Sequence, residues 1–550
     1  LGAHERTVAE RISVLPGGVT PALAAAVCAG TGVPAAEVPE LLAALVDRSV
    51  LQLAPDAGRY RMLETLREYG IEQLGEQAPA VRALAARHLT RLVARHEPLL
   101  RGPGQLAALR LLRAEYDNVL AALRHLCDSG DAAGAVRLAM RLSWYWQMLG
   151  RDADAAYWLA EALALPGGRP SLERDCAEAV LLLNRITSRS TLSAEAVKES
   201  ESELRSVTDR LLARPRLPGL AGALAAVTLA FLEETDAALV IIGRLIDGPD
   251  PWLAGLARMF RAQFAENQGD LDQVRTDVTA ALDCFARAGD RWGLVTTLPM
   301  RALVRQYDGD LDGAAADLRE ARAQSRDFGS LSVTDEIFID LRWIDLLMRQ
   351  GDGDRALAAA GHARELAQRS GRAELGVLID ALEAAVWARL GELDRARELI
   401  GSAEAELGPF GGDHGQAVVS GVRALVALEA DDPAGAEAAL VRAYAAAVAS
   451  GDMPIVSMVA VNAAGLAQLR GQHARTALLL GAAARLRGTH DRSDPRISEM
   501  TGRSRAALGE AAFTESYQLG WHLDGKAAAA QVDPARWSRE LDGPGQARRA

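Results

Sequence analysis

Residues 309–318 read GDLDGAAADL, and variants of this pattern return along the second half of the chain. The clearest copies are separated by 40, 42, 40, 40 and 40 residues and begin at Gly269, Gly309, Gly351, Gly391, Asp431 and Gly471. Weaker copies begin earlier, at Gly150, Thr191 and Glu233. A constant step of this length is typical of a repeat architecture. The sequence therefore predicts an array of similar units, each about 40 residues long.

Each unit has the pattern of a helical hairpin. The glycine ends one helix, because a residue without Cβ adopts the left-handed conformation at little cost. The acid that follows caps the next helix. Small residues near the start of that helix, such as Ala314, Ala356 and Ala396, allow close helix packing. One hairpin cannot bury its apolar face alone, so we expect an all-α, α-α superhelical, tetratricopeptide-like solenoid with a concave partner-binding face.

The composition supports helices and excludes several classes of function. Hydrophobic residues make up 49% of the 550 residues but aromatic residues only 5%, which favours helices over sheets. The net charge of -12 argues against nucleic-acid binding by the bulk surface. The four cysteines are scattered, without a CxxC pair, which fits a cytoplasmic protein without structural zinc or disulfides. The longest uncharged runs are interrupted by proline, glycine or polar residues, so we expect no membrane span.

Two motifs imitate ligand sites. Asp308, Asp310, Asp312 and Gly313 match the opening of a calcium-binding EF-hand loop. The twelfth position of that loop needs a carboxylate and here is Arg319, so we interpret the acids as helix caps.

The second motif, GWHLDGKA at 520–527, matches a phosphate-binding P-loop up to Lys526. Ala527 replaces the Ser or Thr that binds Mg²⁺, and a helical pattern precedes the motif where a P-loop follows a strand. No HExxH or GxSxG motif is present, and GGDHG at 411–415 is typical of a loop. We therefore expect no catalytic residue, metal site or cofactor within this chain, and no enzyme.

Residues 1–76 have a different pattern. Three helical segments, the second with Thr20 as its N-cap, precede two short strands at 50–53 and 59–62. A further helix begins at Leu63. Three helices, a two-stranded wing and a helix are the outline of a small winged-helix domain.

Four stretches resemble the large regulators called STAND ATPases, in their SARP-type and LuxR-type bacterial forms. The stretches are LLAALVDRSVLQL (41–53), RYRMLETLREYGIEQL (59–74), LLRAEYDNVLAAL (111–123) and SWYWQMLGRDADAAYWLAEAL (143–163). The resemblance covers residues 5–165 by motif and the rest by architecture. It implies a P-loop ATPase, a winged helix and a tetratricopeptide-like sensor in that order, with a DNA-binding effector at one end.

The resemblance also implies what each part does. The chain would be the regulatory and signal-transducing part of a transcriptional regulator, in contact with an upstream ATPase that binds ATP or ADP with Mg²⁺. DNA would be bound only by an effector domain outside this chain, and a protein or small effector by the concave face. The winged-helix signature is carried by Arg59, Tyr60, Arg61, Met62, Leu63, Glu64, Arg67 and Tyr69.

One position of the signature departs from the family. Many members have a His-Asp pair after the wing that senses the β-phosphate of ADP, and here Met62-Leu63-Glu64 stands there. Leu63 cannot donate a hydrogen bond to phosphate, so we interpret it as a core residue between wing and helix.

The arginines of the wing allow two interpretations. Arg59, Arg61 and Arg67 could contact DNA, as in other winged helices. Residues 1–76, however, contain six basic and ten acidic residues, which favours a solvated face of paired charges. We therefore expect the winged helix to be a regulatory joint and not a DNA reader.

The aromatic cluster Trp144, Tyr145, Trp146 and Trp158 also has two interpretations. It could form a cage for a ligand, but aromatic residues at helical spacing more often pack a core. We predict a packed hinge that passes changes of the array to the winged helix.

The predicted domains are a winged helix at 1–76, connecting helices at 77–130, the repeat array at 131–525 and a flexible tail at 526–550. Two alternatives remain open. One is a free-standing tetratricopeptide scaffold that assembles a protein complex, and the other is an enzyme with an unrecognised site.

Overall fold

The computed structural model describes residues 1–54, 58–188, 194–217, 219–232, 234–329, 331–370, 373–407 and 412–534. The chain divides into two compact units. Unit 1 comprises Leu1–Ile241 and Ala288–Arg291, and unit 2 comprises Ile242–Arg287 and Trp292–Ala550. The division falls inside the predicted array of 131–525, so hairpins belong to both units.

Unit 1 begins with the elements that were predicted for a winged helix. They are α1 (Ala3–Ile12), α2 (Pro21–Val27), α3 (Val38–Asp47), β1 (Leu51–Ala54), β2 (Arg59–Met62) and α4 (Glu64–Leu74). The strands pair antiparallel, with Leu51 opposite Met62. Thr20 caps α2 as expected, since its hydroxyl accepts from the backbone N–H of Leu23 at 3.3 Å. No other strand occurs in the described parts of the chain.

The rest of unit 1 is helical. A 3-10 turn, η1 (Gly75–Gln77), leads into α5 (Ala78–His96), and η2 (Glu97–Arg101) leads into α6 (Gln105–Ala114) and α7 (Tyr116–Asp128). The helices that follow are α8 (Ala132–Met148), α9 (Asp152–Ala164), α10 (Leu172–Ser188), α11 (Ala194–Leu212) and α12 (Leu220–Phe231). The next helix, α13 (Thr235–Ile246), contains the boundary between the two units at Ile241. The weak repeat copy that begins at Thr191 starts outside the described residues, as does the one at Glu233.

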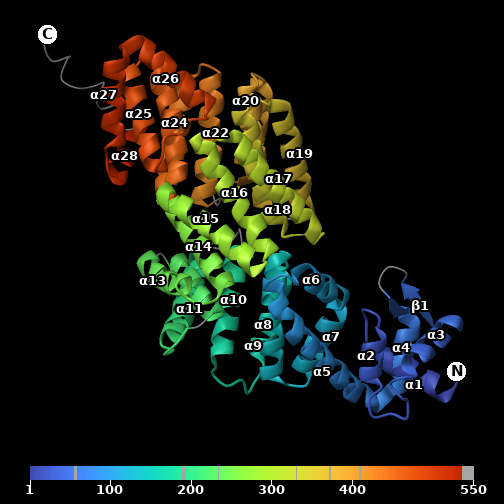
Figure 1. Ribbon diagram of the computed structural model, residues 1–550. Helices are drawn as coiled ribbons and strands as arrows, with labels where there is room; N and C mark the ends of the chain where they lie inside the picture. Colours follow the sequence, from blue (N-terminus) through green and yellow to red (C-terminus); the bar gives the residue numbers. More distant parts are fainter. Residues whose placement is uncertain are drawn as a thin grey trace, which may run out of the picture. The chain divides into compact units, whose positions relative to one another are not determined.

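Unit 2 continues as paired helices. The first are α14 (Pro251–Asn267), α15 (Leu271–Ala288), α16 (Arg291–Asp308), α17 (Leu311–Phe328), α18 (Val333–Arg349), α19 (Gly353–Ser370) and α20 (Ala373–Arg389). The others are α21 (Leu393–Leu407), α22 (Asp413–Glu429), α23 (Pro433–Ser450), α24 (Met453–Leu469), α25 (His473–Arg487), α26 (Pro495–Leu508), α27 (Glu510–Trp521) and α28 (Gly525–Val532). Figure 1 shows the later helices side by side. The prediction of an all-α solenoid is confirmed.

The repeated turns have the predicted conformation. The six residues that begin the strongest copies all have φ between 53° and 86°: Gly269, Gly309, Gly351, Gly391, Asp431 and Gly471. In each turn the N–H of the next residue donates to a carbonyl five residues earlier, for example Asp310 to Arg305 at 2.8 Å. This is the Schellman closure of a helix. Several of the following acids cap the next helix, as Asp310 does by accepting from Gly313 at 2.9 Å.

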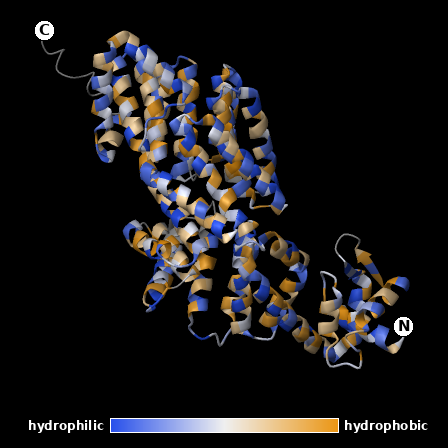
Figure 2. Cartoon of the chain, in the orientation of Figure 1, coloured by the Kyte–Doolittle hydropathy of each residue, from blue (hydrophilic) through white to orange (hydrophobic). Residues whose placement is uncertain are grey.

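The core of unit 2 is built from small aliphatic residues between neighbouring helices. In α23 to α25, for example, Ala439, Leu440, Val459, Ala463 and Leu479 are all at most 1% exposed. Hydrophilic and hydrophobic residues are interspersed along the helices (Figure 2). Each hairpin therefore completes its core against its neighbours in the chain, as a solenoid requires. No helix among the described residues is both long and apolar enough to cross a membrane.

The predicted flexible tail of 526–550 is wrong at its start. Gly525–Val532 forms α28, which packs against α25 and buries Ala528 and Val532. The helix forms because Asp524 caps it, accepting from Ala527 N–H at 2.7 Å. Residues 535–550 lie outside the described part of the chain.

The two motifs that imitate ligand sites have structural roles. In the EF-hand-like stretch, Asp308 pairs with Arg275 and Asp310 caps α17. In the P-loop-like stretch, Gly520 belongs to helix α27, where a Cβ would overlap the carbonyl oxygen of Leu478 in α25. This glycine is needed for close packing of two helices.

Candidate functional site

A buried ion pair joins the β-hairpin of unit 1 to the helices that follow it. Arg59 is the first residue of β2, and Glu115 lies between α6 and α7. Nη1 and Nη2 of Arg59 donate to Oε1 and Oε2 of Glu115 at 2.5 and 3.0 Å. The two side chains are only 4% and 5% exposed. A two-point, charge-assisted fork is directional, so it holds the hairpin in one orientation on α7.

Asn118 and the turn before α2 complete this contact, which we call the Arg59 joint (Arg59, Glu115, Asn118, Gly17 and Gly18). Nη2 of Arg59 also donates to the carbonyls of Gly17 and Gly18 at 3.2 and 3.0 Å. The Asn118 amide accepts from Gly17 N–H at 2.9 Å and donates to the Gly18 carbonyl at 2.9 Å. It also donates to Glu115 at 2.8 Å. Three separate segments of unit 1 therefore meet in one polar network.

Glycine is required at position 18 of the joint. Its φ is +76°, a left-handed conformation that other residues adopt at a cost. A Cβ there would lie 2.8 Å from the Tyr60 carbonyl oxygen, too close for any side chain. The backbone of this turn can therefore approach β2 closely only because residue 18 is glycine.

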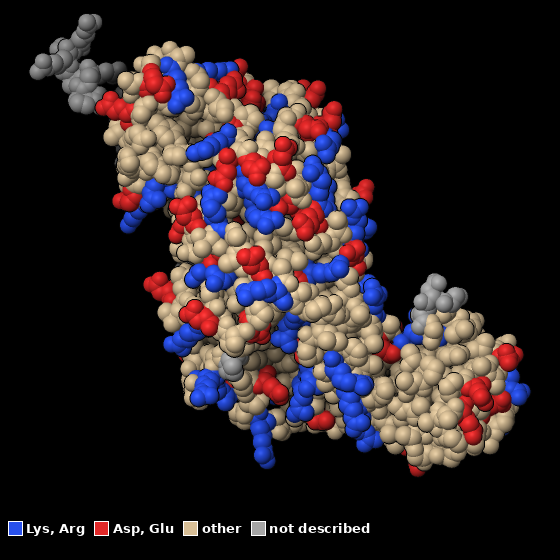
Figure 3. Space-filling model, in the orientation of Figure 1, with Lys and Arg blue, Asp and Glu red and all other residues tan. Residues whose placement is uncertain are grey.

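The joint corrects one prediction about the wing. We expected Arg59 to lie on a solvated face with Arg61 and Arg67, but Arg59 is buried, because Glu115, 56 residues away, supplies its carboxylate. Arg61 is exposed, and Arg67 pairs with Glu64 at 2.9 Å, as the paired-face interpretation expected. On the face drawn in Figure 3, basic and acidic side chains are interspersed over the helices.

The interpretation of Leu63 as a core residue is wrong. Its side chain is 51% exposed, because Leu63 is the extended N-cap residue of α4 and the helix buries Gly70 and Leu74 instead. Tyr69 is 59% exposed. Of the other signature residues, Tyr60 and Met62 are half-buried and Glu64 is exposed. The apolar residues Leu63 and Tyr69 are thus on the surface of unit 1.

The aromatic cluster lies in the packed interior next to the joint. Tyr145 and Trp146 in α8 are fully buried, Trp158 in α9 is 7% exposed, and Trp144 is half-buried. Buried side chains of this size form core, while a ligand cage requires accessible ring faces. The predicted role as a hinge stays a prediction.

Tyr116, which the sequence analysis did not single out, connects this cluster to the joint. Its hydroxyl accepts from the Trp146 indole N–H at 2.8 Å and donates to Asp154 at 2.6 Å. Its ring stacks on Tyr145 with centroids 5.5 Å apart. Burial and the Asp154 hydrogen bond raise the pKa of Tyr116, so it remains a neutral donor. Because Tyr116 follows Glu115 directly, the joint and the aromatic core share the start of α7.

A cleft of about 560 Å³ lies beside the joint. Its lining includes Val14, Arg67, Ile71, Arg82, Ala85, Asn118, Arg124 and His125. Burial and nearby Arg82 lower the pKa of His125, so this imidazole is neutral at physiological pH. A ligand in the cleft would touch both the N-terminal segment and helices α5 and α7.

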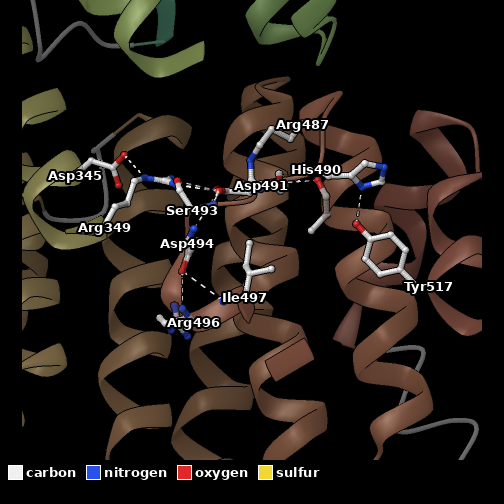
Figure 4. Close-up of polar contacts among 12 residues, drawn as sticks. Asp345, Arg349, Arg487, His490, Asp491, Ser493, Asp494, Arg496, Ile497 and Tyr517 are labelled. Atoms are coloured by element: carbon white, nitrogen blue, oxygen red, sulfur yellow. Dashed lines mark hydrogen bonds and ion pairs between the residues drawn. The ribbon is translucent and has the colours of Figure 1, made fainter. Parts of the chain in front are cut away.

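A second polar cluster lies in unit 2, around the loop between α25 and α26 (Figure 4). Arg349, the last residue of α18, donates from Nη1 to both carboxylate oxygens of Asp491 at 2.8 and 3.0 Å, and to Ser493 at 2.7 Å. Its Nε donates to Asp345 at 2.9 Å. Arg487, at the end of α25, lies 3.6 Å from Asp491. We call Arg349, Arg487, Asp491 and Ser493, with Tyr307, the Asp491 cluster.

Charge balance holds the Asp491 cluster together. The Asp491, Arg349 and Arg487 side chains are 1%, 8% and 11% exposed. Burial alone would lower the pKa of Arg349, but the carboxylates of Asp345 and Asp491 outweigh burial and raise it. The Arg349 and Arg487 guanidinium carbons lie 5.5 and 5.1 Å from the centroid of the Tyr307 ring in α16. The arginine pair is thus neutralised and stacked on an aromatic ring.

The sequence contains a local signal for the helix that follows this cluster. The Asp494-Pro495 pair indicates a helix start, and Asp494 caps α26 by accepting from Arg496 N–H at 2.8 Å. Nothing local indicates the partner of Asp491, because Arg349 is 142 residues away.

No protein-family model matches the chain. Proteins provisionally named HTH-type transcriptional regulators, from Mycobacterium bovis and from Mycobacterium tuberculosis strain H37Rv, are 32% identical to it over 148 residues. The match covers 26% of this chain and 16% of each relative's length, so it spans only a small part of those proteins.

Solved structures with detectable similarity include a STAND protein with a tetratricopeptide repeat sensor from Pyrococcus horikoshii. It is 12% identical, with 94% of this chain and 66% of that chain covered, at a TM-score of 0.32. The tetratricopeptide domain of P58(IPK) is 16% identical, with 76% and 98% covered, at a TM-score of 0.23. The Cut9–Hcn1 hetero-tetramer of the APC/C is 12% identical, with 76% and 92% covered, at a TM-score of 0.29.

Proposed function

We propose that this chain is the regulatory part of a STAND-type transcriptional regulator. In this proposal residues 1–76 are a winged helix, and the helical array binds a protein or small effector on its concave face. The array controls an ATPase and a DNA-binding effector encoded elsewhere in the same cytoplasmic protein. The partial similarity to HTH-type transcriptional regulators supports this role.

The observation that carries the proposal is the Arg59 joint. Other winged helices often use basic residues of the wing to bind DNA, but Arg59 of this chain is buried against Glu115. The hairpin is therefore tied to the start of α7, and α7 is tied through Tyr116 to the aromatic core of α8. A segment held in this way is suited to transmit a movement of the array and not to read bases.

Nucleotide binding belongs, in this proposal, to the part of the protein outside the chain. The P-loop-like stretch is helix, turn and helix, so it lacks the strand-to-loop geometry that cradles phosphates. The ATPase would respond to the array through contacts with the winged helix.

The test uses the complete natural reading frame that contains this chain. The full protein and a version ending before residue 1 are compared in ATP hydrolysis and in promoter binding. We expect the shorter version to lack the array's control, and therefore to hydrolyse ATP or bind promoter DNA constitutively. A reading frame without an ATPase or DNA-binding domain would contradict the regulator and favour the tetratricopeptide scaffold.

A further inference from the structure

Unit 2 contains a contact between hairpins that are far apart along the chain. In a solenoid each hairpin mainly touches its neighbours in the chain. Here the end of α25 and the loop after it contact the Gly269 turn, which follows α14, and Arg349 of α18, which lies 142 residues before Asp491. Besides the Arg349–Asp491 pair, the backbone N–H of Arg492 donates to the carbonyl of Tyr307 at 3.2 Å. Helix α24 also contacts α14 directly. The hairpins of unit 2 thus close on themselves.

Two glycines allow the backbones to meet at this closure. Gly269, in the turn after α14, has φ +71°, and Gly488, after α25, has φ +83°. A Cβ on Gly269 would overlap the carbonyl oxygen of Leu486, and a Cβ on Gly488 would overlap that of Gly269. The contact therefore tolerates no side chain at either position.

The loop is anchored on its far side to the last hairpins. His490 hydrogen-bonds the Tyr517 hydroxyl of α27 at 2.7 Å (Figure 4). The centroid of its ring also lies 4.2 Å from that of Trp521. These contacts hold the loop against α27. A separation at the closure would therefore fall between the loop and the earlier helices, where Arg349 and Gly269 lie.

The contacts named at the closure are ion pairs, hydrogen bonds and close approaches of backbone. Neighbouring hairpins bury aliphatic side chains against each other, as in the α23 to α25 core, together with ion pairs such as Arg322 with Asp340. After a separation at the closure, water can solvate its charged and polar groups again. Because each hairpin keeps its neighbours when the closure parts, separation costs far less than unfolding.

We propose that the Asp491 cluster and the Gly269–Gly488 contact form a latch that switches unit 2 between a closed and an open arrangement. In the open arrangement, α14 to α18 and the 487–494 loop are apart while the hairpins between them remain folded. The latch is a two-state element of the kind through which a bound partner can shift a population. This inference does not depend on the proposed regulator role.

The first test opens the latch at the glycine contact. Spin labels are placed at two exposed positions, Gln268 on the α14 side of the latch and Arg503 in α26 on the other side. The distribution of distances between the two labels is measured by electron double resonance. Gly269→Ala should lengthen the mean distance, because its Cβ cannot coexist with the Leu486 carbonyl. Gly471→Ala is the matched control, since Gly471 has φ +69° at the equivalent turn and nothing within 4 Å of a Cβ. It should leave the distance unchanged.

The second test removes only the charge. Asp491→Asn keeps an oxygen for the backbone N–H groups of Ser493 and Asp494, both 3.1 Å away. It removes the Asp491 carboxylate from Arg349, which keeps its pair with Asp345. A disulfide reports the closed state, because a Cβ on Gly309 would lie 3.9 Å from that of Arg492, within disulfide reach. Asp491→Asn should slow disulfide formation in the Gly309→Cys/Arg492→Cys variant by about tenfold or more, the effect of losing charged hydrogen bonds.

Each outcome decides for or against the latch. A longer distance in Gly269→Ala and slower disulfide formation in Asp491→Asn, with the helical circular dichroism of the parent chain, support it. An unchanged distance in Gly269→Ala would overturn it, as would an unchanged disulfide rate in Asp491→Asn or failure of the disulfide to form in the otherwise unaltered chain. Loss of helical signal in both variants would also overturn it, since the hairpins would then depend on the closure.

Discussion

Removing one partner of the Arg59 joint should release the β-hairpin from the start of α7. Arg59→Met deletes four hydrogen bonds, two to Glu115 and one each to the carbonyls of Gly17 and Gly18. It also leaves the Glu115 carboxylate, 5% exposed, without its cation. Breaking a buried pair in this way costs about 3–5 kcal/mol. We expect that loss in the local stability of β1, β2 and α4.

The assay is hydrogen exchange of these backbone amides under native conditions, which reports local opening without requiring the whole chain to unfold in one step. A loss of about 3–5 kcal/mol corresponds to exchange faster by roughly two to three and a half orders of magnitude. The double variant Arg59→Met/Glu115→Met should lose less than Arg59→Met alone, because no charge remains buried. Arg61→Met, an exposed change on the same strand, is the control and should stay within about 0.5 kcal/mol.

The reasoning would be refuted by an Arg59→Met exchange rate within tenfold of the parent chain, since the pair would then contribute little. A double variant less stable than the single one would show that the charge was not the cause. In that case the hydrogen bonds to the Gly17 and Gly18 turn would account for the effect.

Three further predictions concern stability. Asp431 has φ +53° and an exposed side chain, so Asp431→Gly should raise the stability of unit 2 by about 0.5–1 kcal/mol in urea unfolding; a loss would contradict the strain argument. Trp146→Ala should lower thermal stability by about 3–5 kcal/mol and admit protease between residues 76 and 104, whereas unchanged stability with loss of a ligand would favour a cage. Burial raises the pKa of the Cys28 and Cys176 thiols to about 11. As pH rises, the thiols of the unfolded chain ionise before those of the folded chain, so the free energy of unfolding should fall above about pH 9 and through pH 11. Thiol reagents at pH 8 should react with these cysteines only after the chain unfolds.

The sequence alone was sufficient for the hairpin repeats, because the interactions that form them are local. A left-handed residue closes one helix through a hydrogen bond that spans five residues, as from Asp310 to Arg305, and an acid caps the next within three. The step of about 40 residues then follows from repetition. Even Asp431, which has a Cβ, adopts the left-handed conformation that glycine has at the other five turns.

Only the tertiary structure decided which charged residues are buried and with which partners. Arg59 and Glu115 are 56 residues apart, and Arg349 and Asp491 are 142 apart, so no local pattern links them. The exposure of Leu63 likewise depends on which face of α4 meets α1, and the end of the array depends on α28 docking on α25. Side-chain burial and ion pairing depend on the packing of distant helices, and the residues of one helix do not encode that packing by themselves.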